Sequence, residues 1–135
     1  MLSYQIKAES LKGGQAKAIA NNGIINFDAS AGRQNNLPNP AELLLTSLAA
    51  CMLKNVERFS KILKYDYVRA EIEIEGFRNE APPFMSEINY VLKVESSMEE
   101  KKLKLLDKNI LKYGTITNTL SKAAKLYGTI EFKNS

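Results

Sequence analysis

At 135 residues the chain is long enough for a real hydrophobic core, and its length predicts a single domain over residues 1–135. The formal net charge of +4 is mild, and the lysines form no basic stripe with interleaved aromatic residues, so we expect no nucleic-acid partner. The chain has no histidine, which excludes Cys–His pairs, Ser–His–Asp triads and the usual zinc sites, and we expect no metal.

Membrane and cofactor motifs are also missing from the sequence. No apolar run reaches the length of a membrane-spanning helix, and the first residues lack a signal-peptide core, so we expect a cytoplasmic protein with no membrane contact. No motif implies a cofactor. The one cysteine, Cys51, excludes an internal disulfide but leaves an intermolecular one open.

The first predicted elements are three strands in an antiparallel meander. Apolar and polar side chains alternate over residues 3–9 and again over residues 15–20, as they do in half-buried strands. Residues 11–14 form a turn between these strands. The tight-turn sequence of residues 21–23 then returns the chain into a third strand, residues 24–28.

A long central helix is predicted over residues 39–63, after a loop of residues 29–38. Asn39 suits the N-cap, Pro40 the first helical position, and Glu42 can reach back to the N–H of the cap. The first half is apolar nearly all round, which predicts that it is buried inside the molecule or inside an oligomer. The second half is amphipathic and should lie on a surface.

Two paired strands are predicted after this helix, over residues 67–75 and 84–94, with a long connection of residues 76–83 between them. The remaining elements are two helices and a last strand. A capping box at residues 97–100 opens the first helix, and Gly114 ends it as a left-handed cap.

The second of these helices is predicted over residues 117–126 and the final strand over residues 127–132, which completes an α+β fold.

Cys51 is the residue with the clearest reactive potential, and two interpretations of it stay open. A lone cysteine on an apolar helix is commonly a small core residue. A reactive cysteine needs an electropositive and partly exposed setting, which Lys54 and Arg58 would supply if they folded back toward the thiol. Both of these charges would otherwise be solvated at the surface.

Two segments resemble the motifs of one protein family. Residues 40–51, PAELLLTSLAAC, resemble the P-x-E-L-L-L-x-x-L-x-x-C segment of the OsmC/Ohr family (osmotically inducible protein C-like and organic hydroperoxide resistance-like proteins). Residues 112–120, KYGTITNTL, resemble its second motif, K-Y-C-P-V-S-N-T-L. The predicted order of strands and helices is similar as well, so the resemblance covers nearly the whole chain.

The resemblance implies an OsmC-like fold and an intertwined homodimer, with the long helices buried between subunits and two active sites at the interface. In active members of the family, the cysteine of the first motif attacks an organic hydroperoxide. The cysteine of the second motif resolves the sulfenic acid as a disulfide, and a dithiol then restores the enzyme. An arginine and a glutamate near the thiol favour the thiolate.

This chain matches the family pattern only in part. Cys51 falls at the peroxidatic position, whereas Gly114 falls where the resolving cysteine would be. The arginine implied by the resemblance corresponds to Gln15, and Arg33 in the loop before the helix is a candidate substitute. Glu42 matches a family glutamate and is a catalytic candidate with Cys51, although it is about half a turn away around the helix and its capping role would account for it alone.

Further predicted contacts to the substrate come from Arg33 and from two residues on the helix face of Cys51, Ser47 and Leu48. Three functions remain open. The chain is a one-cysteine thiol peroxidase of oxidative-stress defence that uses an external thiol, a non-catalytic dimer that binds a small hydrophobic or lipid-like ligand at its interface, or a purely structural dimer.

Overall fold

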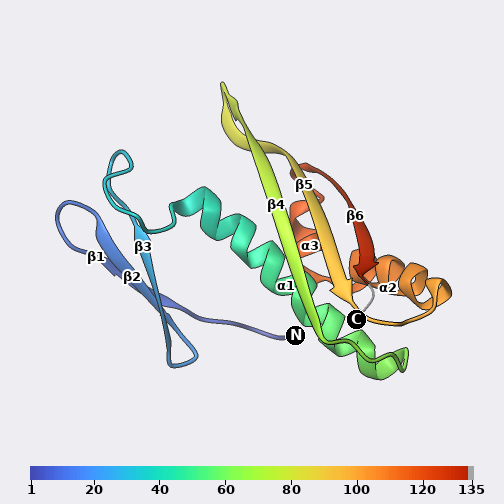
Figure 1. Cartoon of the computed structure of the whole chain (residues 1–135). Helices are drawn as coiled ribbons and strands as arrows, with labels where there is room; N and C mark the ends of the chain where they lie inside the picture. The colour runs from blue at the N-terminus through green and yellow to red at the C-terminus, as the bar shows by residue number, and fades with distance from the viewer. Residues whose placement is uncertain (134–135) are drawn as a thin grey trace. The chain divides into compact units, whose positions relative to one another are not determined.

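The computed structural model describes residues 1–133, which form two compact units that divide between Leu44 and Leu45 (Figure 1). The helix α1, Pro40–Ile62, runs continuously from the first unit into the second. The order of strands and helices confirms the predicted α+β fold. The prediction of one domain over residues 1–135 stays a prediction.

The first unit contains the predicted meander. Its strands are β1, Lys7–Ser10, β2, Gln15–Ala20, and β3, Gly23–Asp28, and both pairs are antiparallel. The turn between β2 and β3 is made by Asn21 and Asn22, whose φ angles are 48° and 67°, a conformation that asparagine tolerates.

The first strand is shorter than predicted because it begins at Lys7 rather than at residue 3. Lys7 pairs with Ile19, and β2 ends one residue later at Ala20. Residues 3–6 therefore have the alternating pattern of a strand but lie beyond the end of the strand that could pair with them.

The second unit is built on a three-stranded sheet in the order β4-β5-β6, namely Arg69–Glu80, Pro83–Glu95 and Lys125–Lys133. The strands β4 and β5 pair in antiparallel fashion as predicted, and β6 adds to β5 in parallel. The predicted long connection at residues 76–83 is wrong. The strands stay paired to Glu80 and Pro83 because an irregularity at Phe77 and Arg78 absorbs the break in alternation.

Two helices, α2, Glu100–Tyr113, and α3, Thr115–Leu120, connect β5 to β6. The helix α2 ends before Gly114 as predicted, whereas its predicted start and both predicted ends of α3 were wrong. The N-cap of α2 is Glu99, which makes no side-chain capping bond, and Ser96 instead accepts a hydrogen bond from the N–H of Met98 at 3.1 Å. The helix α3 is shorter than predicted, since pairing with β5 already begins at Lys125.

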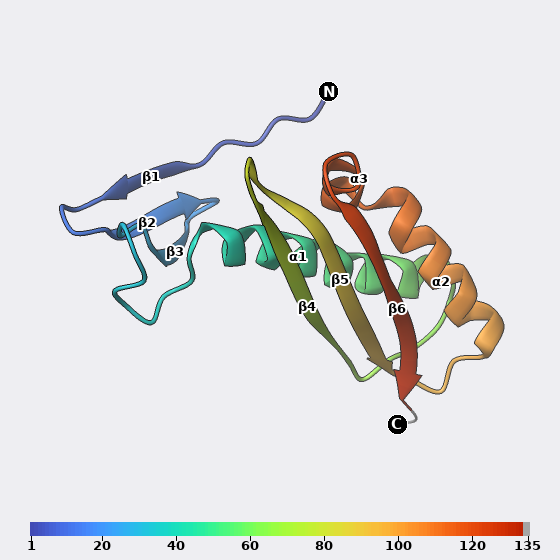
Figure 2. The ribbon, with the colours of Figure 1, turned by 90° about the horizontal axis from the view of Figure 1, so that it is seen from above.

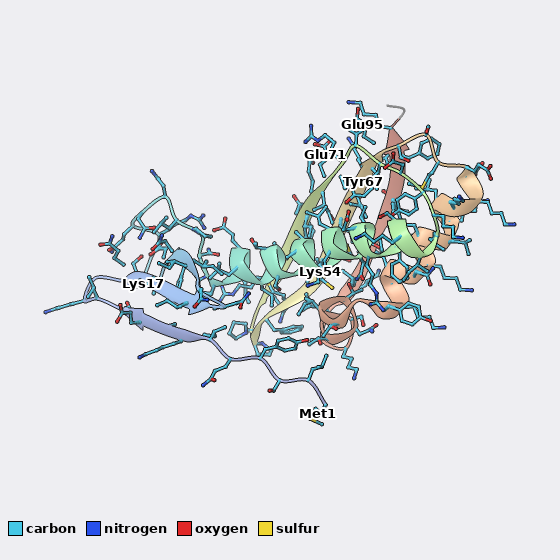
Figure 3. The ribbon with its side chains drawn as sticks, turned by 90° about the horizontal axis from the view of Figure 1, so that it is seen from below. Met1, Lys17, Lys54, Tyr67, Glu71 and Glu95 are labelled. Carbon is cyan, nitrogen blue, oxygen red and sulfur yellow. The ribbon has the colours of Figure 1, made fainter. Side chains whose placement is uncertain are left out.

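The core of the second unit lies between the sheet and its helices, which cover one face of it (Figure 2). From Ile88 onward every second residue of β5 is buried on that face, and four apolar residues of α1 and two of α2 are buried as well. These core residues are Ile88, Tyr90, Leu92 and Val94, then Leu48, Met52, Val56 and Phe59, then Leu106 and Ile110. The opposite face carries charged side chains, among them Glu71 of β4 (Figure 3).

Within the single chain, the apolar first half of α1 is only partly buried. The buried residues lie from Leu48 onward, whereas Leu45 is half-buried and Thr46 and Ala50 are exposed. The chain by itself therefore does not cover the apolar first half of this helix all round. No helix within residues 1–133 is long and apolar enough to cross a membrane.

Two neighbouring glycines of the turn before β2 differ in how closely other parts of the chain approach them. Gly13 and Gly14 both have positive φ, 99° and 96°, but a Cβ on Gly13 would meet open space. A Cβ on Gly14 would lie 2.2 Å from the backbone nitrogen of Ser30.

We expect Gly13→Ala to lower the free energy of unfolding by about 1 kcal/mol through backbone strain alone. Gly14→Ala should cost clearly more, because the chain segment at Ser30 must also move. Urea denaturation of both variants measures the difference, and equal losses would contradict the close approach.

Candidate active site

The start of α1 is held by the predicted capping box. The N–H of Asn39 donates to Glu42 Oε1 at 3.0 Å, and the N–H of Glu42 donates to Asn39 Oδ1 at 2.9 Å. Each residue thus satisfies a backbone donor that the first turn of a helix leaves without a partner. The capping role of Glu42 is confirmed.

Arg33 lies against the same carboxylate. Its Nη2 donates to Glu42 Oε1 at 2.6 Å, in an ion pair whose side chains are both about half exposed. The hydrogen bonds from the Asn39 N–H and from Arg33 hold the pKa of the Glu42 carboxyl below its ordinary value. The first unit therefore brings together an arginine and a glutamate that are nine residues apart, and the carboxylate is kept ionised.

The loop that carries Arg33 is fixed by Asp28 at the end of β3. The Oδ1 atom of Asp28 accepts hydrogen bonds from the N–H and the hydroxyl of Ser30, at 2.9 and 2.5 Å, and these bonds lower the pKa of Asp28. The hydroxyl of Ser30 in turn accepts from the N–H of Gln34 at 3.3 Å. Sequence reasoning missed Asp28, although Asp-x-Ser is a common way to begin such a turn.

Gln15 occupies the position where the resemblance implies an arginine. It lies at the start of β2 opposite Asp28, and it lines a surface hollow of about 400 Å³ together with Gln34 and Asn35. The side chain of Gln15 carries no charge. The cation that lies beside Glu42 is Arg33.

Cys51 lies on α1 in the second unit and is half-buried. Two polar groups are 4.0 Å from its sulfur: the hydroxyl of Thr117 on α3, and the side-chain amide nitrogen of Asn55 one helical turn further along α1. Both of these residues are buried, with exposed fractions of 2% for Thr117 and 6% for Asn55. A partly accessible thiol therefore faces buried hydrogen-bonding groups.

The two basic residues near Cys51 in sequence do not both remain available to the thiol. The guanidinium of Arg58 lies over the ring of Phe59, 5.4 Å from its centroid. Lys54 is exposed on α1 (Figure 3).

The prediction of a left-handed cap at Gly114 is wrong, because its φ and ψ are −77° and 118°. The need for glycine comes instead from a close approach. A Cβ at this position would lie 2.7 Å from Thr117 Oγ1 and 3.0 Å from the carbonyl oxygen of Ile110. The hydroxyl that contacts Cys51 therefore occupies space that any side chain at position 114 would need.

The other predicted site residues lie on α1. Leu48 is fully buried in the core and Ser47 is half-buried. Their part in substrate binding stays a prediction. Sequence reasoning missed Thr117, although it lies in the second motif. Within residues 1–133 there is no cluster of three or more His, Cys, Asp or Glu residues that could hold a metal ion.

The sequence profile of OsmC-like proteins matches residues 33–127, well over half of the chain. The chain belongs to the OsmC-like protein family. The matched range includes Arg33, Glu42, Cys51 and Thr117. No match is found among the curated protein sequences.

Solved structures of OsmC-like proteins have the same fold. An OsmC-like protein from Mycoplasma pneumoniae is 21% identical, with a TM-score of 0.87 over 97% of each chain. The organic hydroperoxide resistance protein OsmC from Legionella pneumophila is 13% identical, with a TM-score of 0.72 over 97% of this chain and 99% of its own. The organic hydroperoxide resistance protein OhrB of Bacillus subtilis is 14% identical, with a TM-score of 0.67 over 98% of each chain.

The ion pair of Arg33 and Glu42 provides a pH-dependent test. In Arg33→Gln the pKa of the Glu42 carboxyl should rise toward its ordinary value of 4.5, and only in part, since the hydrogen bond from Asn39 remains. A carboxyl whose pKa is lower in the folded state than in the unfolded state stabilises the fold at pH values above its unfolded-state pKa. This stabilisation is lost as the pH falls through the folded-state pKa.

The stability of the natural protein should therefore exceed that of Arg33→Gln at neutral pH, and the difference should shrink below pH 4.5. Carbon NMR of the Glu42 carboxyl and urea denaturation at several pH values measure the two effects. An unchanged pKa in the variant would contradict the ion pair.

Proposed function

We propose that this OsmC-like protein is a one-cysteine thiol peroxidase, in which Cys51 reduces organic hydroperoxides and an external thiol restores it. The observation that carries the proposal is the setting of Cys51, a half-buried thiol whose sulfur faces two buried polar groups. A cysteine that served only as core would be enclosed by apolar side chains. Two similar structures are of proteins named for organic hydroperoxide resistance.

The proposed reaction begins when the thiolate of Cys51 attacks one peroxide oxygen. A sulfur–oxygen bond forms, the oxygen–oxygen bond breaks, and the leaving alkoxide takes a proton and departs as an alcohol. The sulfur is thereby oxidised by two electrons to a sulfenic acid. Because position 114 is glycine, a first external thiol displaces water to form a mixed disulfide, and a second thiol releases Cys51.

The family resemblance supports a proposed role in peroxide reduction for Arg33 and Glu42, the ion pair of the first unit. Arg33 is proposed as a contact to the substrate, and Glu42 as the carboxylate that holds the guanidinium in place as well as capping α1. Ser47 and Leu48 are proposed to contact the organic part of the substrate.

Trapping of the sulfenic acid tests this function. A stoichiometric organic hydroperoxide is added to the purified protein with dimedone present, and the intact mass is followed. We expect a dimedone adduct at Cys51 that forms faster than with hydrogen peroxide and is absent in Cys51→Ser. A protein that forms no adduct, and whose Cys51 is also slow to alkylate, would overturn the peroxidase and favour a dimer that binds an apolar ligand.

We propose in addition that the protein acts as a homodimer. The first unit exposes apolar residues on both faces of its three-stranded sheet, with Ile24 61% and Ile25 49% exposed. A surface of this kind commonly marks a protein interface. Light scattering should give twice the chain mass of 15.1 kDa, and Ile25→Lys should weaken the association. A monomer at micromolar concentration would contradict the dimer.

A further inference from the structure

The hydrogen-bonding groups around Cys51 are placed at an unusual distance from its sulfur. Both Thr117 Oγ1 and Asn55 Nδ2 are 4.0 Å from Sγ, at the outer limit of a hydrogen bond to sulfur. Within residues 1–133, no other hydrogen bond of the Thr117 hydroxyl or of the Asn55 amide nitrogen accompanies these contacts. Two buried polar groups thus point at one sulfur atom without reaching it closely.

The distance of 4.0 Å matches a different occupant, an oxygen atom bonded to the sulfur. Such an oxygen, bonded to Sγ on the side of these groups, would lie nearer to them than the sulfur does, in the range where an oxygen accepts hydrogen bonds. We infer that Thr117 and Asn55 form a cradle for the oxygen that Cys51 takes from a peroxide.

The chemistry of the two groups fits this role. In the transfer step the sulfur–oxygen bond forms while the oxygen–oxygen bond breaks, and negative charge passes from the sulfur, through the transferred oxygen, to the leaving oxygen. The amide N–H of Asn55 and the hydroxyl of Thr117 can both donate to the transferred oxygen while this charge passes through it. Donors that are buried and already in place stabilise such charge more strongly than water does.

Gly114 is part of the same arrangement. A Cβ there would lie 2.7 Å from Thr117 Oγ1 and 3.0 Å from Thr117 Cβ, so a side chain at position 114 would displace the hydroxyl. Glycine keeps the hydroxyl beside Cys51. The sulfenic acid would then be held by hydrogen bonds until an external thiol arrives, rather than being closed into a disulfide within the chain.

This inference rests on the proposed function and is tested by comparing two reactions of Cys51. Oxidation by an organic hydroperoxide leaves an oxygen on the sulfur, whereas alkylation by iodoacetamide does not. Thr117→Val removes the hydroxyl at nearly constant volume and should slow oxidation by roughly tenfold to a hundredfold, the loss of one hydrogen bond to a charged group. The rate of alkylation of Cys51 should change much less.

Thr117→Ser is the matched control, because it keeps the hydroxyl and should retain most of the oxidation rate. Asn55→Ala repeats the test from the other side of the cradle and serves if Thr117→Val does not fold. If the variants lose the same factor in the rates of oxidation and of alkylation, Thr117 has only a structural role and the inference is overturned. Oxidation unchanged in the variants, with the natural protein reacting rapidly, would overturn the cradle and leave the peroxidase intact.

A crystal structure after treatment with excess hydrogen peroxide gives a readout that does not depend on catalytic rate. We expect the oxygen on Cys51 within hydrogen-bond distance of Thr117 Oγ1 and Asn55 Nδ2. An oxygen that points away from both groups would overturn the inference even if the protein is an efficient peroxidase. If the natural protein reacts slowly but its oxygen lies in the cradle, the proposed function fails and the cradle stands.

Discussion

The packing of α1 and α2 against one face of β5 is the interaction on which the second unit depends. Four alternate residues of this strand, from Ile88 to Val94, are at most 3% exposed, and Met52 and Val56 of α1 are fully buried. Burying a side chain of this size contributes about 1.5–3 kcal/mol relative to leaving it in water. The same packing fixes the rotation of α1 about its axis and therefore the direction in which Cys51 points.

The site on the second unit follows from this constraint. With Met52 and Val56 in the core, Cys51 lies beside them on α1, and the short helix α3 brings Thr117 against it. Phe59 of α1 contacts Tyr113 at the end of α2, with ring centroids 6.0 Å apart, directly before the connection to α3. The contact of Cys51 with Thr117 is thus supported by packing at the C-terminal end of α2.

Local patterns in the sequence predicted the features that depend on neighbouring residues. The capping box of Asn39 and Glu42 and the turn at Asn21 need only three or four consecutive positions, and the structure confirms both. The boundaries that were wrong depend on distant partners. Residues 3–6 lack a partner strand, and α3 ends early because Lys125 pairs with β5.

The candidate site also combines features that depend on neighbouring residues with features that depend on distant ones. Cys51 and Glu42 could be named from the motif, and Arg33 from its loop. The role of Thr117 could not be read from periodicity, because its contact with Cys51 joins positions 66 residues apart. Gly114 illustrates the point most clearly: its sequence context indicated a helix cap, whereas its actual constraint is a steric approach to Thr117.

The parallel pairing of β6 with β5 has a consequence for the synthesis of the chain. The segments that pair, Glu87–Glu95 with Lys125–Lys133, are separated by two helices, so the sheet is completed only by the last described strand. On the ribosome, the hairpin of β4 and β5 would emerge with an unpaired edge on β5, and such edges favour association with other chains. Until β6 emerges, this edge of β5 therefore stays open to association with other chains.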